Sequence, residues 1–143
     1  MNTRTFRYMA AVMAAVIFVV LWRLISPDTE NSLPQITMIT LLYAGLIFPV
    51  SEEIIFRALI QNSLSRRIKP HLLQQNFISP ANLISSSIFA VAHALYFENP
   101  IALTVFFPSL VFGYIYEKER HIAAPIVLHS SYNLIGLFGV AMF

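Results

Sequence analysis

Three ionisable residues lie close together inside one long apolar stretch of this chain. Glu52, Glu53 and Arg57 stand in residues 46–60, where Ser51 is the only other polar side chain. A charged group at the centre of a membrane span costs about 2.5–3.5 kcal/mol on insertion scales. Three such groups in one span therefore point to a specific role, because an ordinary membrane anchor has no use for them.

The composition places the chain among membrane proteins. Of its 143 residues 57% are hydrophobic and 11% are charged, and the mean hydropathy is +0.70. This length allows about five spans of roughly 20 residues. We therefore expect an all-α, polytopic helix bundle that forms a single domain, residues 1–143.

Cysteine and charge exclude several classes of protein. The chain has no cysteine, so a disulfide framework, a thiolate nucleophile and a cysteine metal site are ruled out. The net charge is +2, and the basic residues are few and flank apolar runs. They favour attraction to an anionic lipid leaflet, and we expect no nucleic-acid partner.

Five apolar runs are predicted to cross the bilayer, and basic residues give their orientation. The runs cover about residues 8–25, 35–64, 81–97, 101–116 and 124–143. Lysine and arginine precede the first run and lie between the second and third and between the fourth and fifth, while the other two loops have neither. The positive-inside rule then predicts a cytoplasmic N-terminus and an external C-terminus. We read the first run as an uncleaved span, and the compact loops favour a prokaryotic inner membrane.

Polar residues interrupt this pattern after the second run. Residues 61–80 include several basic side chains, with apolar residues at near-helical spacing between them. This pattern suggests a helix that lies in the membrane interface and is broken at Pro70.

Helix geometry separates the two adjacent glutamates. Glu53 and Arg57 are four residues apart, so they share a helix face and are expected to form an ion pair. Glu52 points about 100° away and is the candidate working carboxylate. Pro49 should leave the carbonyl of Gly45 without its usual partner, an irregularity that is tolerated at membrane depth beside a cavity.

Two later runs carry histidines at comparable depth. His93 lies between alanines, which allow close helix approach, and His129 shares a helix face with Asn133. At 1.5 Å per residue, Glu52, His93 and His129 lie on the order of 8–18 Å from the cytoplasmic ends of their spans. They could therefore converge on one cavity. Taken alone, each histidine is more simply a hydrogen-bond partner between helices, and the serines in these runs are best read as packing or backbone-bonding residues.

These motifs together resemble a known family, the CAAX-protease and bacteriocin-processing (CPBP, or ABI) group of intramembrane endopeptidases. Its signatures are Glu-Glu-x-x-x-Arg, Phe-x-x-x-His and His-x-x-x-Asn, in that order. Here they stand at residues 52–57, 89–93 and 129–133, and the likeness covers about residues 40–140. Many members have more spans before the glutamate pair than this chain does.

The resemblance implies glutamic-type hydrolysis of a peptide bond without a metal cofactor. It implies that Glu52 and His93 activate a water, that His129 and Asn133 stabilise the oxyanion, and that Glu53 and Arg57 support them. The partner would be a peptide or protein cleaved near the membrane, and a homo-oligomer is compatible with this.

Three other interpretations remain open from the residues alone. In a zinc protease, Glu52, His93 and His129 would be the ligands, although His-Glu-x-x-His is absent. A proton-coupled carrier could use the same groups, although no paired repeats are visible. A non-catalytic immunity or scaffold protein could also retain this fold.

Overall fold

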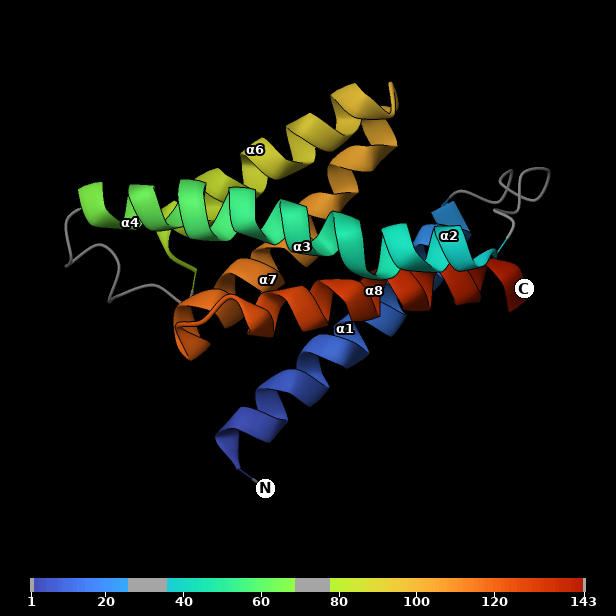
Figure 1. Ribbon diagram of the computed structural model, residues 1–143, viewed down its shortest axis with the longest axis horizontal. Helices are drawn as coiled ribbons and strands as arrows, with labels where there is room; N and C mark the ends of the chain where they lie inside the picture. The colour runs from blue at the N-terminus through green and yellow to red at the C-terminus, as the bar shows by residue number, and fades with distance from the viewer. Residues whose placement is uncertain (1, 26–35, 69–77, 143) are drawn as a thin grey trace. The chain divides into compact units, whose positions relative to one another are not determined.

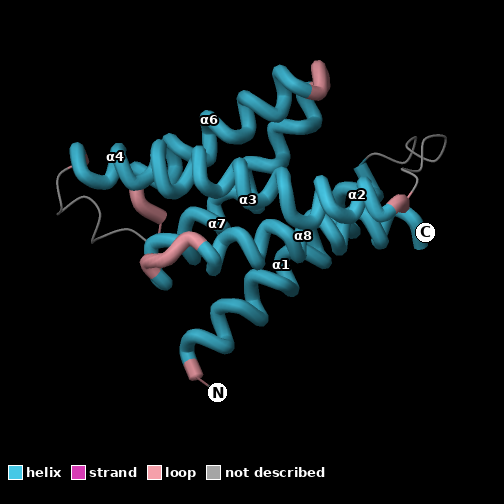
Figure 2. Tube along the Cα trace, viewed as in Figure 1, coloured by secondary structure: helices cyan, strands magenta, loops and turns pink. Residues whose placement is uncertain are grey.

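The structure, a computed structural model, is helical throughout the residues it describes, which are 2–25, 36–68 and 78–142. Within these ranges there is no strand, and loops are short (Figure 2). The expected all-α fold is therefore confirmed. The helical segments in chain order are α1 (Thr3–Ile25), a continuous run Met38–Arg67, α6 (Pro80–Tyr96), a second continuous run Pro100–Glu119, and α8 (Ala123–Met142).

Two of these segments, Met38–Arg67 and Pro100–Glu119, are long and apolar enough to cross a membrane. The apolar stretches Thr5–Leu21 and Ala123–Phe138 are shorter. The helical segments match the five predicted runs, whereas the five-span topology and the cytoplasmic N-terminus stay predictions.

The helix that carries the glutamate pair changes type along its length. It consists of α2 (Met38–Leu42), η2 (Tyr43–Ile47), α3 (Phe48–Glu53), η3 (Ile54–Gln61) and α4 (Asn62–Arg67). The η2 and η3 segments are π-helical, with hydrogen bonds to the fifth residue back. Both carboxylates thus lie in a short α-helical segment between two π-helical ones, a feature that the sequence pattern did not reveal.

The ends of the helices follow local chemistry. Thr37 and Ser79 accept hydrogen bonds from backbone N–H groups of the first turns of α2 and α6. The Met38–Arg67 run ends at Arg67, three residues beyond the predicted limit at residue 64, and the next residue, Ile68, is extended. The region of the expected interface helix from residue 69 to 77, with Pro70, lies outside the described residues.

The run Pro100–Glu119 begins as the 3₁₀ helix η4 (Pro100–Val105) and continues as α7 (Phe106–Glu119). Pro108 lies in the first turn of α7, where a missing N–H is tolerated. The change from 3₁₀ to α-helix, between Val105 and Phe106, therefore lies before Pro108. In Figure 1, α6 (yellow) and α7 (orange) meet through the turn that precedes η4.

The chain forms two compact units, which are described separately. Unit 1 comprises residues 1–49 and 127–143, and unit 2 comprises residues 50–126. Unit 2 buries Phe89, Phe112 and Ile115 together with a group of polar side chains. Many large apolar side chains of α1 and of the Met38–Arg67 run are exposed, as suits surfaces that face lipid. The single-domain assignment of residues 1–143 stays a prediction.

Candidate functional site

A fully buried ion pair lies within unit 2. Arg57 Nε donates to Glu53 Oε2 at 2.9 Å, and both side chains have no exposed surface. The pair predicted from the spacing of four residues is therefore present. A buried charge is stable only when it is paired and its remaining hydrogen-bonding atoms are used.

The other donors of Arg57 reach two neighbouring helices. Nη2 donates to the carbonyl and to Oγ of Ser109 on α7, at 3.0 and 2.7 Å. Nη1 donates to Gln61 Oε1 at 3.2 Å and lies 3.5 Å from Ser86 Oγ on α6. Arg57 thus connects η3 with α6 and α7, and the sequence signalled only its bond to Glu53.

Glu52 turns away from this buried pair and faces His93 on α6. Glu52 Oε2 lies 3.9 Å from His93 Nε2, and the two side chains are 25% and 21% exposed. This separation is too long for a direct hydrogen bond. The structure therefore brings together two of the four predicted catalytic residues, side by side and partly accessible.

The ring of His93 is held in place by Phe89. Nδ1 of His93 lies 3.0 Å from the carbonyl oxygen of Phe89. Because a carbonyl can only accept, this contact assigns the proton to Nδ1 and turns Nε2 toward Glu52. The Phe89 ring also packs on the imidazole, with centroids 4.2 Å apart, and Phe56 packs edge-on against Phe89 at 4.9 Å. Sequence reasoning missed this positioning contribution of Phe89.

The other two predicted catalytic residues lie on α8 in unit 1. His129 is buried, and Asn133 is one helical turn further along. Asn133 Nδ2 donates to the carbonyl of Ala44 at 2.9 Å. Whether His129 and Asn133 act together with Glu52 and His93 stays a prediction.

Pro49 explains why Ala44 needs that donor. In an α-helix the Ala44 carbonyl would accept from the N–H of Phe48, but this N–H donates to Tyr43. In π-helical spacing the donor would be residue 49, which is proline and has no N–H. The sequence predicted that Pro49 would disturb the backbone bonding at Gly45, and the structure shows an irregularity at the neighbouring Ala44 carbonyl.

Two serines behave as packing and backbone-bonding residues, as expected. Ser85 Oγ donates to the carbonyl of Phe56 at 2.7 Å, and Ser131 Oγ donates to the carbonyl of Val127 at 2.8 Å. The first bond joins α6 to η3, and the second lies within α8.

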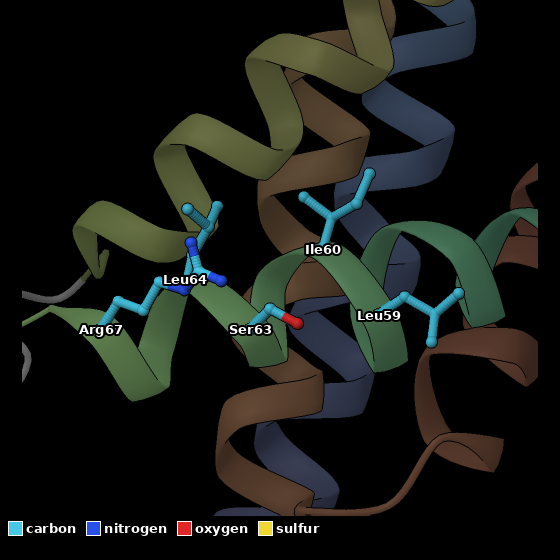
Figure 3. Close-up of a pocket in the computed structure, with 5 residues that line it drawn as sticks. All are labelled: Leu59, Ile60, Ser63, Leu64 and Arg67. Atoms are coloured by element: carbon cyan, nitrogen blue, oxygen red, sulfur yellow. The ribbon is translucent and has the colours of Figure 1, made fainter.

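An open groove of about 360 Å³ lies along η3 and α4 (Figure 3). Its lining consists of Leu59, Ile60, Ser63, Leu64 and Arg67. These five residues include no carboxylate and no imidazole. The groove therefore lacks groups that could activate a water, and the Glu52–His93 pair remains the candidate site.

Glu52 and His93 could supply two ligands to a metal ion. A catalytic zinc site ordinarily takes three protein ligands. Among the described residues, no group of three histidine, aspartate or glutamate side chains is arranged to hold a metal. His129 belongs to the other unit, so the three-ligand zinc alternative stays a prediction.

Two known bacterial proteins are similar to this chain in sequence. UPF0177 protein YxdF of Lactococcus lactis subsp. lactis (strain IL1403) is 30% identical over 92 residues, 64% of this chain and 45% of that protein. Membrane-embedded CAAX protease MroQ of Staphylococcus aureus (strain USA300) is 30% identical over 111 residues, 76% of this chain and 43% of MroQ. The matched regions are thus less than half the length of these relatives. No solved structure matches the chain.

A comparison with models of protein families assigns the chain to a family. The model described as type II CAAX prenyl endopeptidase Rce1-like matches residues 33–135, which include the glutamate pair, His93 and the His129–Asn133 motif. The expected resemblance is confirmed. Since the match covers most of the sequence, this chain belongs to the type II CAAX prenyl endopeptidase Rce1-like family.

Proposed function

We propose that this chain is an intramembrane endopeptidase that hydrolyses a peptide bond with a water activated by Glu52 and His93. One observation carries the proposal: Glu52 Oε2 and His93 Nε2 lie 3.9 Å apart and are partly accessible, beside a carboxylate that is fully buried and neutralised. Membership of a CAAX endopeptidase family and the name of MroQ support peptide hydrolysis.

The separation of Glu52 and His93 suits a shared water. Hydrogen bonds to oxygen have lengths of about 2.7–3.0 Å, so one water can contact both atoms across a gap of 3.9 Å. Glu52 would accept a proton from this water while the water oxygen attacks the substrate carbonyl. The protonated Glu52 would then give that proton to the amide nitrogen as the C–N bond breaks, so that an amine and a carboxylic acid leave. Positioned base catalysis typically contributes about 10²–10⁴-fold.

His129 and Asn133 are the proposed donors to the oxyanion. Removing one such donor typically lowers kcat by about 10²–10³-fold. Asn133 already uses one amide hydrogen on Ala44, at 2.9 Å, and its amide carries a second. The Ala44 bond would therefore orient the Asn133 side chain, and the second hydrogen would serve the reaction.

The substrate is proposed to be a peptide or protein cut close to the membrane surface. The proposed location is the inner membrane of a prokaryote, in keeping with two bacterial relatives. A homo-oligomer is compatible with this function and is not required by it.

The experiment compares peptide termini in membranes that contain wild-type, Glu52→Gln or His93→Ala protein. Termini produced by the wild type should disappear with both variants, while the folded amount of Glu52→Gln protein should be unchanged. Glu98→Gln is the matched control, because Glu98 is an exposed carboxylate on the turn after α6. If Glu52→Gln protein produces the same termini as wild type, the proposal is wrong.

Metal analysis of the purified protein and a chelator arm separate this mechanism from the zinc alternative. The glutamic-type mechanism predicts cleavage that survives chelation. Loss of cleavage with a chelator, and its recovery with zinc, would support the metal mechanism instead.

A further inference from the structure

The contacts of η3 with α7 define a parallel register. Arg57 donates to the carbonyl of Ser109, and Gln61 Nε2 donates to the carbonyl of Gly113 at 3.1 Å. In both contacts the partner lies 52 positions further along the chain. A constant offset over one helical turn means that the two helices run side by side in the same direction.

The contacts of α3 and η3 with α6 define an antiparallel register. Arg57 approaches Ser86, and Glu52, earlier on the first helix, approaches His93, later on the second. The Ser85 bond to the Phe56 carbonyl lies on the same seam. The Glu52–His93 pair is therefore one end of a continuous interface between the two helices.

The other end of that interface is organised by Gln61. This side chain is fully buried, and each of its polar atoms has a partner. Its Oε1 accepts from Arg57 at 3.2 Å, and its Nε2 donates to Gly113 and, at 2.8 Å, to Glu117 Oε1. Gln61 thus continues the hydrogen-bond network of the buried ion pair onto α7.

Glu117 extends the same network to the start of α6. Glu117 Oε1 also accepts a hydrogen bond from Ser79 Oγ, and Ser79 caps α6 by accepting from the N–H of Asn82 at 3.0 Å. One carboxylate oxygen therefore joins η3, α7 and the first turn of the helix that carries His93.

Gly113 makes this junction sterically specific. A Cβ at residue 113 would overlap Oδ1 of Asn82 and would lie 2.8 Å from Oε1 of Gln61. Asn82 is itself held by a bond to the Leu110 carbonyl at 2.9 Å. The three helices approach so closely here that a larger side chain would force Asn82 or Gln61 to move.

We propose that Gln61, Glu117, Ser79 and Gly113 form a positioning cluster that sets the register of η3 against α6 and thereby holds Glu52 opposite His93. None of the four contacts the reacting pair, and Gln61 lies nine residues from Glu52, on the order of 13 Å along the helix. A slip of one turn would move Glu52 by about 5.4 Å, more than its present distance from His93. The meaning of this cluster for catalysis rests on the proposed peptidase function.

Paired cysteines can measure the register directly. The chain has no cysteine of its own, so Glu52→Cys with His93→Cys supplies the only two thiols. Comparison pairs combine Glu52→Cys with Ala90→Cys or Tyr96→Cys, which lie about one turn to either side of His93 on α6. A short bifunctional thiol reagent applied to membranes should link 52 to 93 faster than to either comparison site.

The test introduces Gln61→Met, Glu117→Met or Glu117→Gln into each pair. Both methionine variants should lower the cross-linking preference of residue 52 for residue 93, over residues 90 and 96, by about tenfold. The reason is that a slip of one helical turn is about as long as the distance that a thiol bridge can span. Glu117→Gln is the matched control and should retain the preference, because its amide oxygen can still accept from Gln61 and Ser79.

Two results would overturn the proposal. The first is a methionine variant that still resists proteolysis, and is therefore folded, but keeps the cross-linking preference of residue 52 for residue 93. The cluster would then have a structural role only. The other is an equal loss in Glu117→Gln and Glu117→Met. Glu117 is only partly buried, so its variants are expected to fold. If Gln61→Met does not fold, the comparison of Glu117→Met with Glu117→Gln decides the question. Cross-linking needs no substrate, so this result is independent of whether the peptidase proposal succeeds.

Discussion

At the scale of single residues, two adjacent glutamates occupy opposite environments. Glu53 has no exposed surface and is bonded to Arg57, whereas Glu52 is 25% exposed and faces an imidazole. A neutralised carboxylate cannot readily act as a base, while a partly solvated one beside His93 can accept a proton. The helix rotation of about 100° between neighbours produces this difference.

The buried pair gives the first stability prediction. Arg57→Ala should destabilise the protein by roughly 3–5 kcal/mol, because Glu53 is left as an unpaired buried charge and Ser109 and Gln61 lose a donor. Thermal unfolding in detergent micelles measures this effect. The double variant Arg57→Ala with Glu53→Gln should be less destabilised than Arg57→Ala alone. A double variant that unfolds at the same temperature as the single one would contradict this explanation.

The sequence revealed part of this residue-scale arrangement. The spacing of four predicted the Glu53–Arg57 bond, because helix neighbours can be calculated from position alone. The bonds from Arg57 to Ser109 and from Gln61 to Gly113 connect residues 52 positions apart. Such contacts depend on how three helices pack, and no local pattern encodes that register.

At the scale of elements, the helix with the glutamate pair is interrupted by Pro49 and two π-helical segments. The sequence predicted a backbone irregularity from the missing N–H of proline. It did not predict the π-helical bonding, in which the N–H of Phe48 donates to Tyr43 and the Ala44 carbonyl accepts from Asn133 instead. Propensity alone does not encode π-helical turns, which are rare and concentrate at functional sites.

Asn133 and Pro49 should therefore be thermodynamically coupled. Asn133→Ala should cost about 1–3 kcal/mol because the Ala44 carbonyl loses a donor. Pro49→Ala restores a backbone N–H five residues after Ala44, so the double variant should be more stable than the sum of the single effects, by about 0.5–3 kcal/mol. Unfolding of the four proteins in a double-mutant cycle measures this coupling.

Cleavage assays on the same four proteins separate the two roles of Asn133. If Asn133 also stabilises the oxyanion, the Asn133→Ala and Pro49→Ala double variant should recover stability but not activity. If the double variant recovers both stability and activity, the only role of Asn133 is to position α8 against the segment that contains Pro49. If the stability costs are strictly additive, the bond from Asn133 to the Ala44 carbonyl does not compensate for the N–H that Pro49 lacks.

At the scale of the whole molecule, the predicted runs and the observed helices agree to within a few residues. α6 covers Pro80–Tyr96 where residues 81–97 were expected, and α8 covers Ala123–Met142 where 124–143 were expected. Apolar length and turn-forming residues such as Asn99 and Pro100 set these limits locally. The convergence of His129 and Asn133 with Glu52 and His93 depends on packing between distant segments, and it stays a prediction.

Membrane orientation is the prediction that belongs to the whole chain. The distribution of lysine and arginine places residues 2, 65 and 121 on the cytoplasmic side and residue 97 outside. Single cysteines are clean reporters because the natural chain has none. In intact cells an impermeant maleimide should label Phe97→Cys at once and should label Asn2→Cys, Ser65→Cys and His121→Cys only after permeabilisation.

Ser87→Cys provides the internal control for this experiment. Ser87 is exposed on the surface of α6, but it lies in the middle of that helix. If α6 spans the bilayer, lipid covers this position, and the thiol should resist labelling before and after permeabilisation. Labelling of residue 87 in permeabilised cells would show that α6 is not a membrane span. Labelling of residues 65 and 97 from the same side would instead overturn the five-span topology, because the two sites flank a single predicted crossing.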